Sequence, residues 1–378
     1  MATWPPRPSR TSRRSKPGCG RDLDRRGQVR IMQWCLSCGR GSASGGMGRR
    51  EFLLAVGQTC LAVGLAPGLA RSQTIMDETA DVKIGREADP EMLKRFGYYD
   101  NPDIQNYVAQ VGQRVVSRAD ARFTFEFKVV DQAYINAMAL PGGFIYVSRG
   151  MLAELNDEAQ LACILGHEIT HANSRHGAKL LTKALGAQLA TLIGLGAAAA
   201  SGSGSAVSGV AQISNHITNY MLLGYGREYE LEADEVGLRY AHRAGYDPRR
   251  LVVFLRHLRR MEILRGQSTY HGFEATHPDT AIRIAKADTM ANLLLAEGGA
   301  LEVKADQYKA QLDRLRYGEA KDQRRIKVYT VKAGDTLASI AREEMGDEGR
   351  RYELASLNGL RDDAVPTPGS RLKLVVKQ

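Results

Sequence analysis

Two histidines and a glutamate, His167, Glu168 and His171, stand in a His-Glu-x-x-His pattern that can build a hydrolytic metal site. Positions four apart on an α-helix differ by about 40° in azimuth and one turn in height. His167 and His171 can therefore direct their imidazoles at one ion, and neutral imidazoles suit zinc. Glu168 is rotated away from that ion, where it can act as general base on a water whose pKa zinc lowers to about 7. The pattern predicts one Zn2+ per chain.

The pattern alone does not establish a metal site, because it arises by chance in roughly one chain in a hundred of average composition. The neighbouring sequence must therefore distinguish a metal site from a chance occurrence. The alternative is a helix that carries two surface histidines. The motif lies in an apolar helix, which we expect Asn156 to cap and Gly177 to end. Two segments with strand character, 123–130 and 144–147, precede it. A strand pattern followed by an apolar helix favours the metal site.

A third metal ligand must come from another part of the chain. His176 is nine residues from His167, about 180° around a continuous helix, so we interpret it as structural. The acidic run 228–234 is a better source, because Glu230 and Asp234 share a helical face. One of these carboxylates can bind the metal while the other accepts the free ring N–H of a ligand histidine. Spacing alone does not choose the glutamate that binds, and an exposed acidic run is the alternative.

The net charge of +10 belongs to the first 70 residues. They hold 12 of the 52 Lys and Arg but 3 of the 42 Asp and Glu, which leaves 40 basic and 39 acidic residues for the rest. A nearly neutral body argues against a nucleic-acid partner. Four of the five cysteines also precede residue 71, and the Cys35/Cys38 pair has no second pair to complete a metal site.

The leader has the features of an export signal. A twin-arginine pattern at Arg49 and Arg50 is followed by the apolar run 52–65 and by small residues that end at Ala70. We therefore expect residues 1–70 to be a disordered leader with a signal peptide, cleaved near Ala70, and a periplasmic location. The Ala/Gly/Ser-rich stretch 184–213 has two interpretations, a membrane-dipping hairpin or two packed helices joined by a loop, and we favour the second.

The ordered motifs of the body resemble the HtpX-like and CAAX-prenyl-endopeptidase family of gluzincins, in particular its soluble periplasmic branch. The matching motifs occupy residues 136–143, 166–171, 230–234, 244–248, 276–278 and 283–284. The resemblance implies that Glu230 is the third zinc ligand and that Asp234 supports the site. It also implies that His277 and Arg283 stabilise an oxyanion or, for His277, that it occupies the open zinc position at rest. Asn136 and Ala137 would lie on an edge strand that pairs with substrate.

Residues 325–378 resemble a LysM domain, through segments 328–341, 354–360 and 368–374. That family binds N-acetylglucosamine chains such as peptidoglycan. Ala338 replaces a frequent aromatic residue, and both tryptophans, Trp4 and Trp34, are in the leader, so no indole can stack on a sugar. Glycan binding and a packing or partner-docking role both remain open for this module.

The predicted fold is α+β: a mainly helical gluzincin domain with a small sheet at 71–301, a linker at 302–324, and a small βααβ LysM-like domain. We expect a zinc endopeptidase in envelope quality control that acts on unfolded or misfolded envelope polypeptides, with peptidoglycan as a further partner, peripheral membrane contact and no nucleic acid. The rivals are a peptidoglycan-associated chaperone or assembly factor, and a cell-wall peptidase that cuts cross-link peptides.

Overall fold

The computed structural model describes residues 77–180, 225–265, 277 and 280–377, and every structural statement below refers to these residues. The predicted leader, the Cys35/Cys38 pair and the stretch 184–213 lie outside the described residues.

Two helices open the described chain where the sequence predicts helical periodicity. They are α2 (Glu78–Phe96) and α3 (Pro102–Val116). The carboxylate of Asp77 accepts the Ala80 N–H and the amide oxygen of Asn101 accepts the Ile104 N–H, so both helices begin at a side-chain cap. At 98–102, where a turn was expected, the chain is irregular up to the start of α3, and Tyr98 forms an isolated β-bridge with Val130.

A three-stranded sheet follows, with the spatial order β1-β3-β2. Its strands are β1 (Glu126–Val130), β2 (Ala137–Leu140) and β3 (Phe144–Ser148). β3 pairs with β1 in parallel and with β2 in antiparallel orientation, so β2 forms an edge of the sheet. Gly142 and Gly143 make the tight turn from β2 to β3, with φ values of 80° and 98° that favour glycine.

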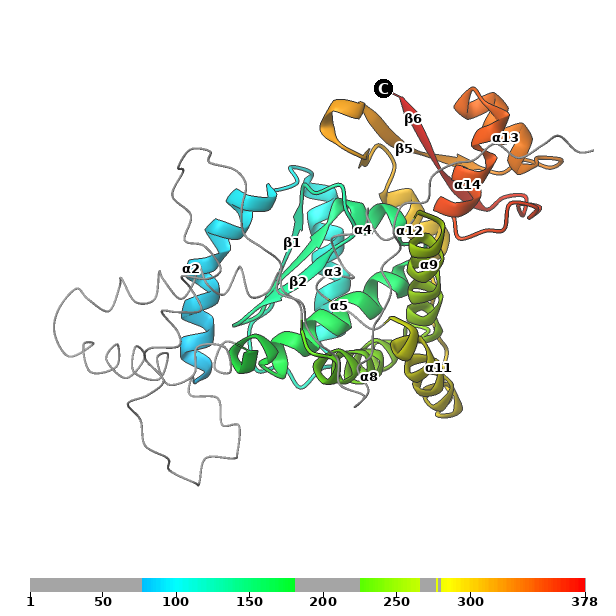
Figure 1. Cartoon of the computed structure of the whole chain (residues 1–378). Helices are drawn as coiled ribbons and strands as arrows, with labels where there is room; N and C mark the ends of the chain where they lie inside the picture. Colours follow the sequence, from blue (N-terminus) through cyan, green and yellow to red (C-terminus); the bar gives the residue numbers. More distant parts are fainter. Residues whose placement is uncertain (1–76, 181–224, 266–276, 278–279, 378) are drawn as a thin grey trace, which may run out of the picture. The chain divides into compact units, whose positions relative to one another are not determined.

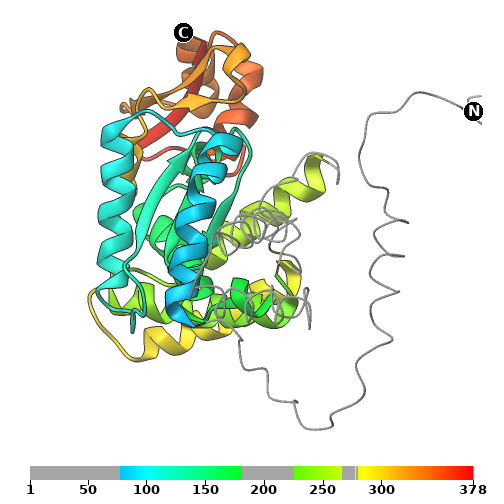
Figure 2. The ribbon, with the colours of Figure 1, turned by 90° about the vertical axis from the view of Figure 1, so that its left-hand side faces the viewer.

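Helices cover both faces of this sheet (Figure 1). Alternate side chains of β2 and β3, such as Met138 and Tyr146, join Ile84 and Met92 of α2 in one apolar cluster. Residues of the opposite face, such as Ala139, pack with α3 and with the helix of the metal motif in the main core. Figure 2 turns α2 toward the viewer, with the sheet behind it.

The motif helix α5 (Glu158–Asn173) lies in the centre of the core, and all its residues are buried. It follows the short helix α4 (Arg149–Glu154). Its cap is Asp157, whose carboxylate accepts the Gln160 N–H, so the prediction of Asn156 was wrong by one residue. α5 also ends before the predicted Gly177: the chain turns at Ser174 and at Arg175, whose φ of 57° is left-handed.

Three further helices complete this part of the chain: α8 (Arg227–Arg243), α9 (Arg249–Arg265) and α11 (Thr280–Ala296). α8 packs along α5, and α11 packs on both α8 and α9 (Figure 1). None of the helices in these described ranges combines the length and the apolarity needed to cross a bilayer.

The C-terminal region contains the predicted strand, helix, helix, strand order, and β4 adds a strand to its sheet. Its elements are α12 (Ala305–Gln311), β4 (Arg316–Tyr317), β5 (Arg324–Thr330), α13 (Leu337–Met345), α14 (Arg351–Leu357) and β6 (Arg371–Lys377). α12 and β4 fall in the segment 302–324, whose charged composition predicts a linker, so this segment has secondary structure.

The C-terminal module shares a core with the rest of the chain. Ile326, Leu357 and Val375 belong to the main apolar cluster rather than to the module's own core. Lys373 on β6 is fully buried, and its ammonium donates to the carbonyl oxygens of Ala153 and Leu155, at 2.5 and 2.6 Å. The module is thereby attached to the connection that leads into α5.

Candidate metal centre

The site is built where α5 crosses α8. His167, Glu168 and His171 come from α5, and Glu230 comes from the first turn of α8. All four side chains are at most 1% exposed. Burial of polar groups requires partners, and α5 and α8 supply them to each other for His167, His171 and Glu230.

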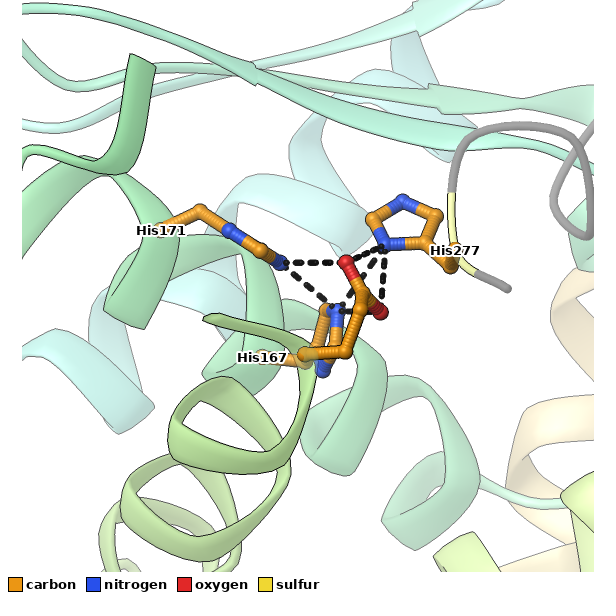
Figure 3. Close-up of side chains that lie close together, drawn as sticks. His167, His171 and His277 are labelled. Carbon is orange, nitrogen blue, oxygen red and sulfur yellow. Dashed lines mark hydrogen bonds and ion pairs between the residues drawn. The ribbon is translucent and has the colours of Figure 1, made fainter. Parts of the chain in front are cut away.

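Four possible ligand atoms converge, one each from His167, His171, Glu230 and His277. The imidazoles of His167, His171 and His277 point toward one another (Figure 3). His167 Nε2 lies 3.0 Å from His171 Nε2 and 3.2 Å from His277 Nδ1. The Glu230 carboxylate lies 2.9 Å from His277 Nδ1, 3.4 Å from His171 Nε2 and 3.6 Å from His167 Nε2. One ligand atom from each of the four residues lies within 4.8 Å of every other.

These separations fit a tetrahedral zinc ion. Two ligand atoms that each lie about 2.0–2.1 Å from a tetrahedral ion are about 3.3–3.4 Å apart. The distances of 3.0 to 3.6 Å that join His167, His171 and Glu230 bracket that value. The donor set of imidazoles and one carboxylate is also the chemistry that zinc prefers. Burial lowers the pKa of His171 well below its usual value, which keeps the ring neutral and able to bind.

A second layer of contacts holds this set in place. His167 Nδ1 lies 2.9 Å from Asp234 Oδ1, as expected for a carboxylate that orients a ligand imidazole. Arg283 donates two hydrogen bonds to Asp234, at 2.7 and 2.8 Å, and one to the His277 carbonyl at 3.1 Å. Its guanidinium also lies 3.0 Å from Glu230. Burial would raise the pKa of Asp234, but the charge and hydrogen bonds of Arg283 lower it below its usual value.

Glu168 lies next to the ligand set without sharing its hydrogen bonds. Both carboxylate oxygens are buried, and neither has a hydrogen-bond partner among the described residues. His277 Nε2 lies 3.5 Å from one of these oxygens. Burial raises the pKa of Glu168 above its usual value, and the nearby His277 lowers it in part. A carboxylate with a raised pKa and free acceptor sites is suited to take up a proton.

The edge strand β2 faces the same centre. Ala137 begins β2, and Asn136 precedes it with its backbone bonded to the end of β3. The carbonyl oxygen of Ala137 lies 3.5 Å from His277 Nε2, and that of Ala139 accepts a hydrogen bond from the Tyr225 hydroxyl at 3.3 Å. His277 and Tyr225 thus lie along the edge of β2 that points away from β3.

The ligand candidates, Glu168, Asp234, Arg283, His277 and Ala137 meet here, whereas the printed backbone contacts of Asn136 are with Ser148 at the end of β3. Two further residues, His176 and Tyr225, were not predicted. Tyr225 stacks on His171 with 3.9 Å between ring centroids, and His176 Nδ1 lies 2.9 Å from His171 Nδ1. Burial lowers the pKa of His176 to about 4. Tyr225 directly precedes Gly226, the N-cap of α8, and no periodic pattern in the sequence identifies it.

Comparison with known proteins gives two family matches. Residues 102–291 match the model of peptidase family M48, and residues 329–375 match the LysM domain. The chain belongs to peptidase family M48. Its M48 match covers α3, the sheet, α5, α8 and most of α11, so the whole candidate centre lies inside it. M48 metallopeptidases depend on zinc, in agreement with the donor set. The predicted family, fold class and cofactor are confirmed.

Several M48 proteins are similar to this chain. The "Beta-barrel assembly-enhancing protease" of Escherichia coli (strain K12) is 28% identical over 196 residues, 51% of this chain and 40% of the relative. The "Mitochondrial metalloendopeptidase OMA1" of Schizosaccharomyces pombe is 29% identical over 212 residues, which are 54% of this chain and 59% of the relative. The human "Metalloendopeptidase OMA1, mitochondrial" is 33% identical over 168 residues, which are 43% of this chain and 31% of the relative. The chain therefore spans about two fifths of the β-barrel assembly-enhancing protease.

Proposed function

We propose that this M48 chain is an exported zinc endopeptidase that cleaves unfolded or misfolded polypeptides of the cell envelope. The observation that carries the proposal is the convergence of His167, His171 and Glu230 beside the buried carboxylate of Glu168. Three ligands with a neighbouring general base are what hydrolysis at zinc requires. In this assignment Asp234 orients His167, and Arg283 fixes the carboxylates of Asp234 and Glu230.

Each residue then has a defined task in peptide hydrolysis. Zinc held by His167, His171 and Glu230 would supply Lewis acidity, which would polarise the scissile carbonyl and lower the pKa of the attacking water. Glu168 takes the proton from that water and returns it to the leaving amine. Its raised pKa supports this role, because the protonated carboxyl must persist until the C–N bond breaks.

Substrate binding involves the edge of β2. An extended peptide can add a strand to a free sheet edge through its backbone hydrogen bonds. Asn136 and Ala137 lie at the start of this edge, and His277 stands between Ala137 and Glu230. We propose that His277 fills the fourth metal position at rest and leaves it when a peptide pairs with β2.

The cellular role rests on the leader and on the relatives. The twin-arginine pattern and the apolar run that ends near Ala70 support export to the periplasm, which leaves 71–301 as the peptidase domain. The name of the β-barrel assembly-enhancing protease supports a role in the quality control of envelope proteins. The LysM match at 329–375 supports peptidoglycan binding by the C-terminal module.

The decisive test is Glu168→Gln in the exported full chain, with Glu235→Gln, an exposed residue of α8, as the matched control. We expect the Glu168 variant to keep one zinc per chain, measured by elemental analysis, and to lose cleavage of fluorescently labelled casein, an unfolded substrate. The control should retain both properties.

Three outcomes separate the candidate functions. Cleavage that survives Glu168→Gln excludes the mechanism. A chain that binds zinc but cleaves no polypeptide, and still prevents aggregation of unfolded protein, is a peptidoglycan-associated chaperone. Release of cross-link peptides from purified peptidoglycan, with casein left intact, identifies a cell-wall peptidase.

A further inference from the structure

His176 occupies a position that a continuous helix could not give it. Five residues after His171, its side chain would point about 140° away around the helix axis. The chain instead leaves α5 after Asn173 and turns at Arg175, in a left-handed conformation with φ of 57°. The Arg175 guanidinium holds this turn through the buried carboxylate of Asp81, at 2.5 Å. The turn returns the His176 ring to the side of His171.

His176 connects the candidate ligand His171 to a carboxylate on the neighbouring helix. Its Nδ1 lies 2.9 Å from His171 Nδ1, and its Nε2 lies 3.3 Å from Glu232 Oε2. The other oxygen of Glu232 accepts a hydrogen bond from the Ser174 hydroxyl at 2.7 Å. Tyr229 stacks on the fully buried His176 ring with 4.5 Å between centroids. His171 therefore contacts one edge of the ring and Tyr229 one face, while the Nε2 edge lies near the Glu232 carboxylate without hydrogen-bond geometry.

The two ligand histidines have different supports. His167 Nδ1 contacts the Asp234 carboxylate directly, at 2.9 Å. His171 Nδ1 faces an imidazole instead, and Glu232 lies beyond that imidazole. We propose that His176 is a positioning residue that fixes the tautomer and the ring orientation of His171 for metal binding, and that Glu232 in turn fixes His176.

The proton positions in this chain of groups follow from His171. Its Nε2 faces Glu230 and His167, so a ring that binds metal through Nε2 carries its proton on Nδ1. That proton is donated to His176 Nδ1, which therefore holds a lone pair. The proton of His176 is then on Nε2, which lies 3.3 Å from Glu232 Oε2. This arrangement of protons presents the His171 lone pair to the centre.

The inference rests on the proposed metal centre and is tested on the metal itself. The zinc dissociation constant of the full chain is measured by competition with a chromophoric chelator, together with thermal unfolding of the metal-free protein. A wild-type chain that fails to bind one zinc would contradict the proposed function and not the role of His176.

His176→Leu and His176→Gln separate positioning from packing. Leucine fills the space but accepts no hydrogen bond, so zinc binding should weaken by about 10- to 100-fold, the range found for groups that orient metal ligands. Glutamine can accept from His171 and donate toward Glu232, so it should restore part of that loss. The control is His257→Gln in α9. His257 contacts Glu154, so its replacement should leave zinc binding unchanged.

Glu232→Ala provides a test that does not depend on folding of a core variant, since this side chain is 43% exposed. Zinc binding should weaken toward the lower end of the same range while unfolding of the metal-free protein is unchanged. Ser174→Ala controls for the lost Ser174 contact and should have no effect on zinc. An unchanged zinc dissociation constant in both Glu232→Ala and a folded His176→Leu overturns the inference.

Discussion

Gly166 and Gly237 bring the backbones of α5 and α8 into direct contact beside the metal centre. A Cβ atom on Gly237 would lie 2.6 Å from the backbone nitrogen of His167, and one on Gly166 would lie 2.6 Å from the Gly237 carbonyl oxygen. Real Cβ atoms do not approach other atoms so closely, so only glycine fits at either position. Glu230 lies two turns before Gly237 on α8, so this contact sets how far Glu230 can reach toward the two histidines.

Gly237→Ala should therefore separate the helices and weaken zinc binding. We expect a loss of about 10-fold or more in zinc affinity, comparable to the loss of a group that orients a ligand. The variant should also unfold at a lower temperature, because overpacking a core costs about 1–3 kcal/mol. The measurements are the zinc dissociation constant and thermal unfolding.

The matched control for this substitution is Gly226→Ala. Gly226 caps the same helix, has an ordinary φ of −70°, and has no atom within 4 Å of a Cβ added there. Wild-type zinc affinity in Gly237→Ala would show that the helix contact does not set the geometry of the ligands.

His277→Ala distinguishes the two roles that the family resemblance implies for His277. Its Nδ1 lies 2.9 Å from Glu230 and 3.2 Å from His167, which is close enough for it to serve as a fourth ligand. Removal of an internal competitor should tighten binding of a peptide hydroxamate to the zinc-loaded chain, because a larger fraction of sites is open. Hydroxamate binding is measured by isothermal titration, with His242→Ala on α8 as control.

Weaker hydroxamate binding in His277→Ala would assign this residue to contact with the bound ligand. In that case His277 would stabilise the oxyanion rather than close the site.

Local patterns were sufficient to predict the residues that follow helical spacing. His167 and His171, and likewise Glu230 and Asp234, are four residues apart, and four-residue spacing places side chains on one face whatever the tertiary structure. The choice of Glu230 over its neighbours required the family resemblance. In the structure Glu230 is fully buried at the centre, whereas Glu232 points to His176.

The residues that the sequence did not identify depend on departures from regular geometry. His176 was interpreted as structural because a continuous helix was assumed, and the left-handed Arg175 changes its direction. Tyr225 reaches His171 and Ala139, which are far from it in the sequence, and no periodic pattern predicts such contacts. The secondary structure of 302–324 was missed because its charged composition resembles that of linkers, while Tyr308 in α12 is fully buried.

Lys373 makes stability depend on pH. Burial lowers the pKa of this lysine from 10.5 to about 7 in the folded chain. Between these two pH values the unfolded chain binds one more proton than the folded chain, so the free energy of unfolding rises with pH across this window. Below about pH 7 both states are protonated, and the contribution is constant. The rise should be on the order of a few kcal/mol.

The measurement compares wild type with Lys373→Met by denaturant unfolding from pH 7 to 10. Glu154, Asp157 and Lys309 are the charged groups that act on Lys373, and they are present in both proteins, so their own titration largely cancels in the difference. The stability of the wild type relative to Lys373→Met should increase over this range. A difference that is flat with pH would mean that the buried ammonium keeps its ordinary pKa.

Tyr225→Phe tests whether Tyr225 competes with substrate for the edge strand. The substitution keeps an aromatic ring against His171 but removes the hydroxyl that donates to the Ala139 carbonyl at 3.3 Å. A peptide that pairs with β2 then gains an acceptor without displacing a hydrogen bond worth about 0.5–1.5 kcal/mol. KM for a peptide substrate should fall by about 2- to 10-fold with kcat unchanged, as measured by steady-state kinetics. A lower kcat at constant KM would instead place the hydroxyl on the reacting carbonyl, and no change in either constant would mean that the peptide does not use the Ala139 carbonyl.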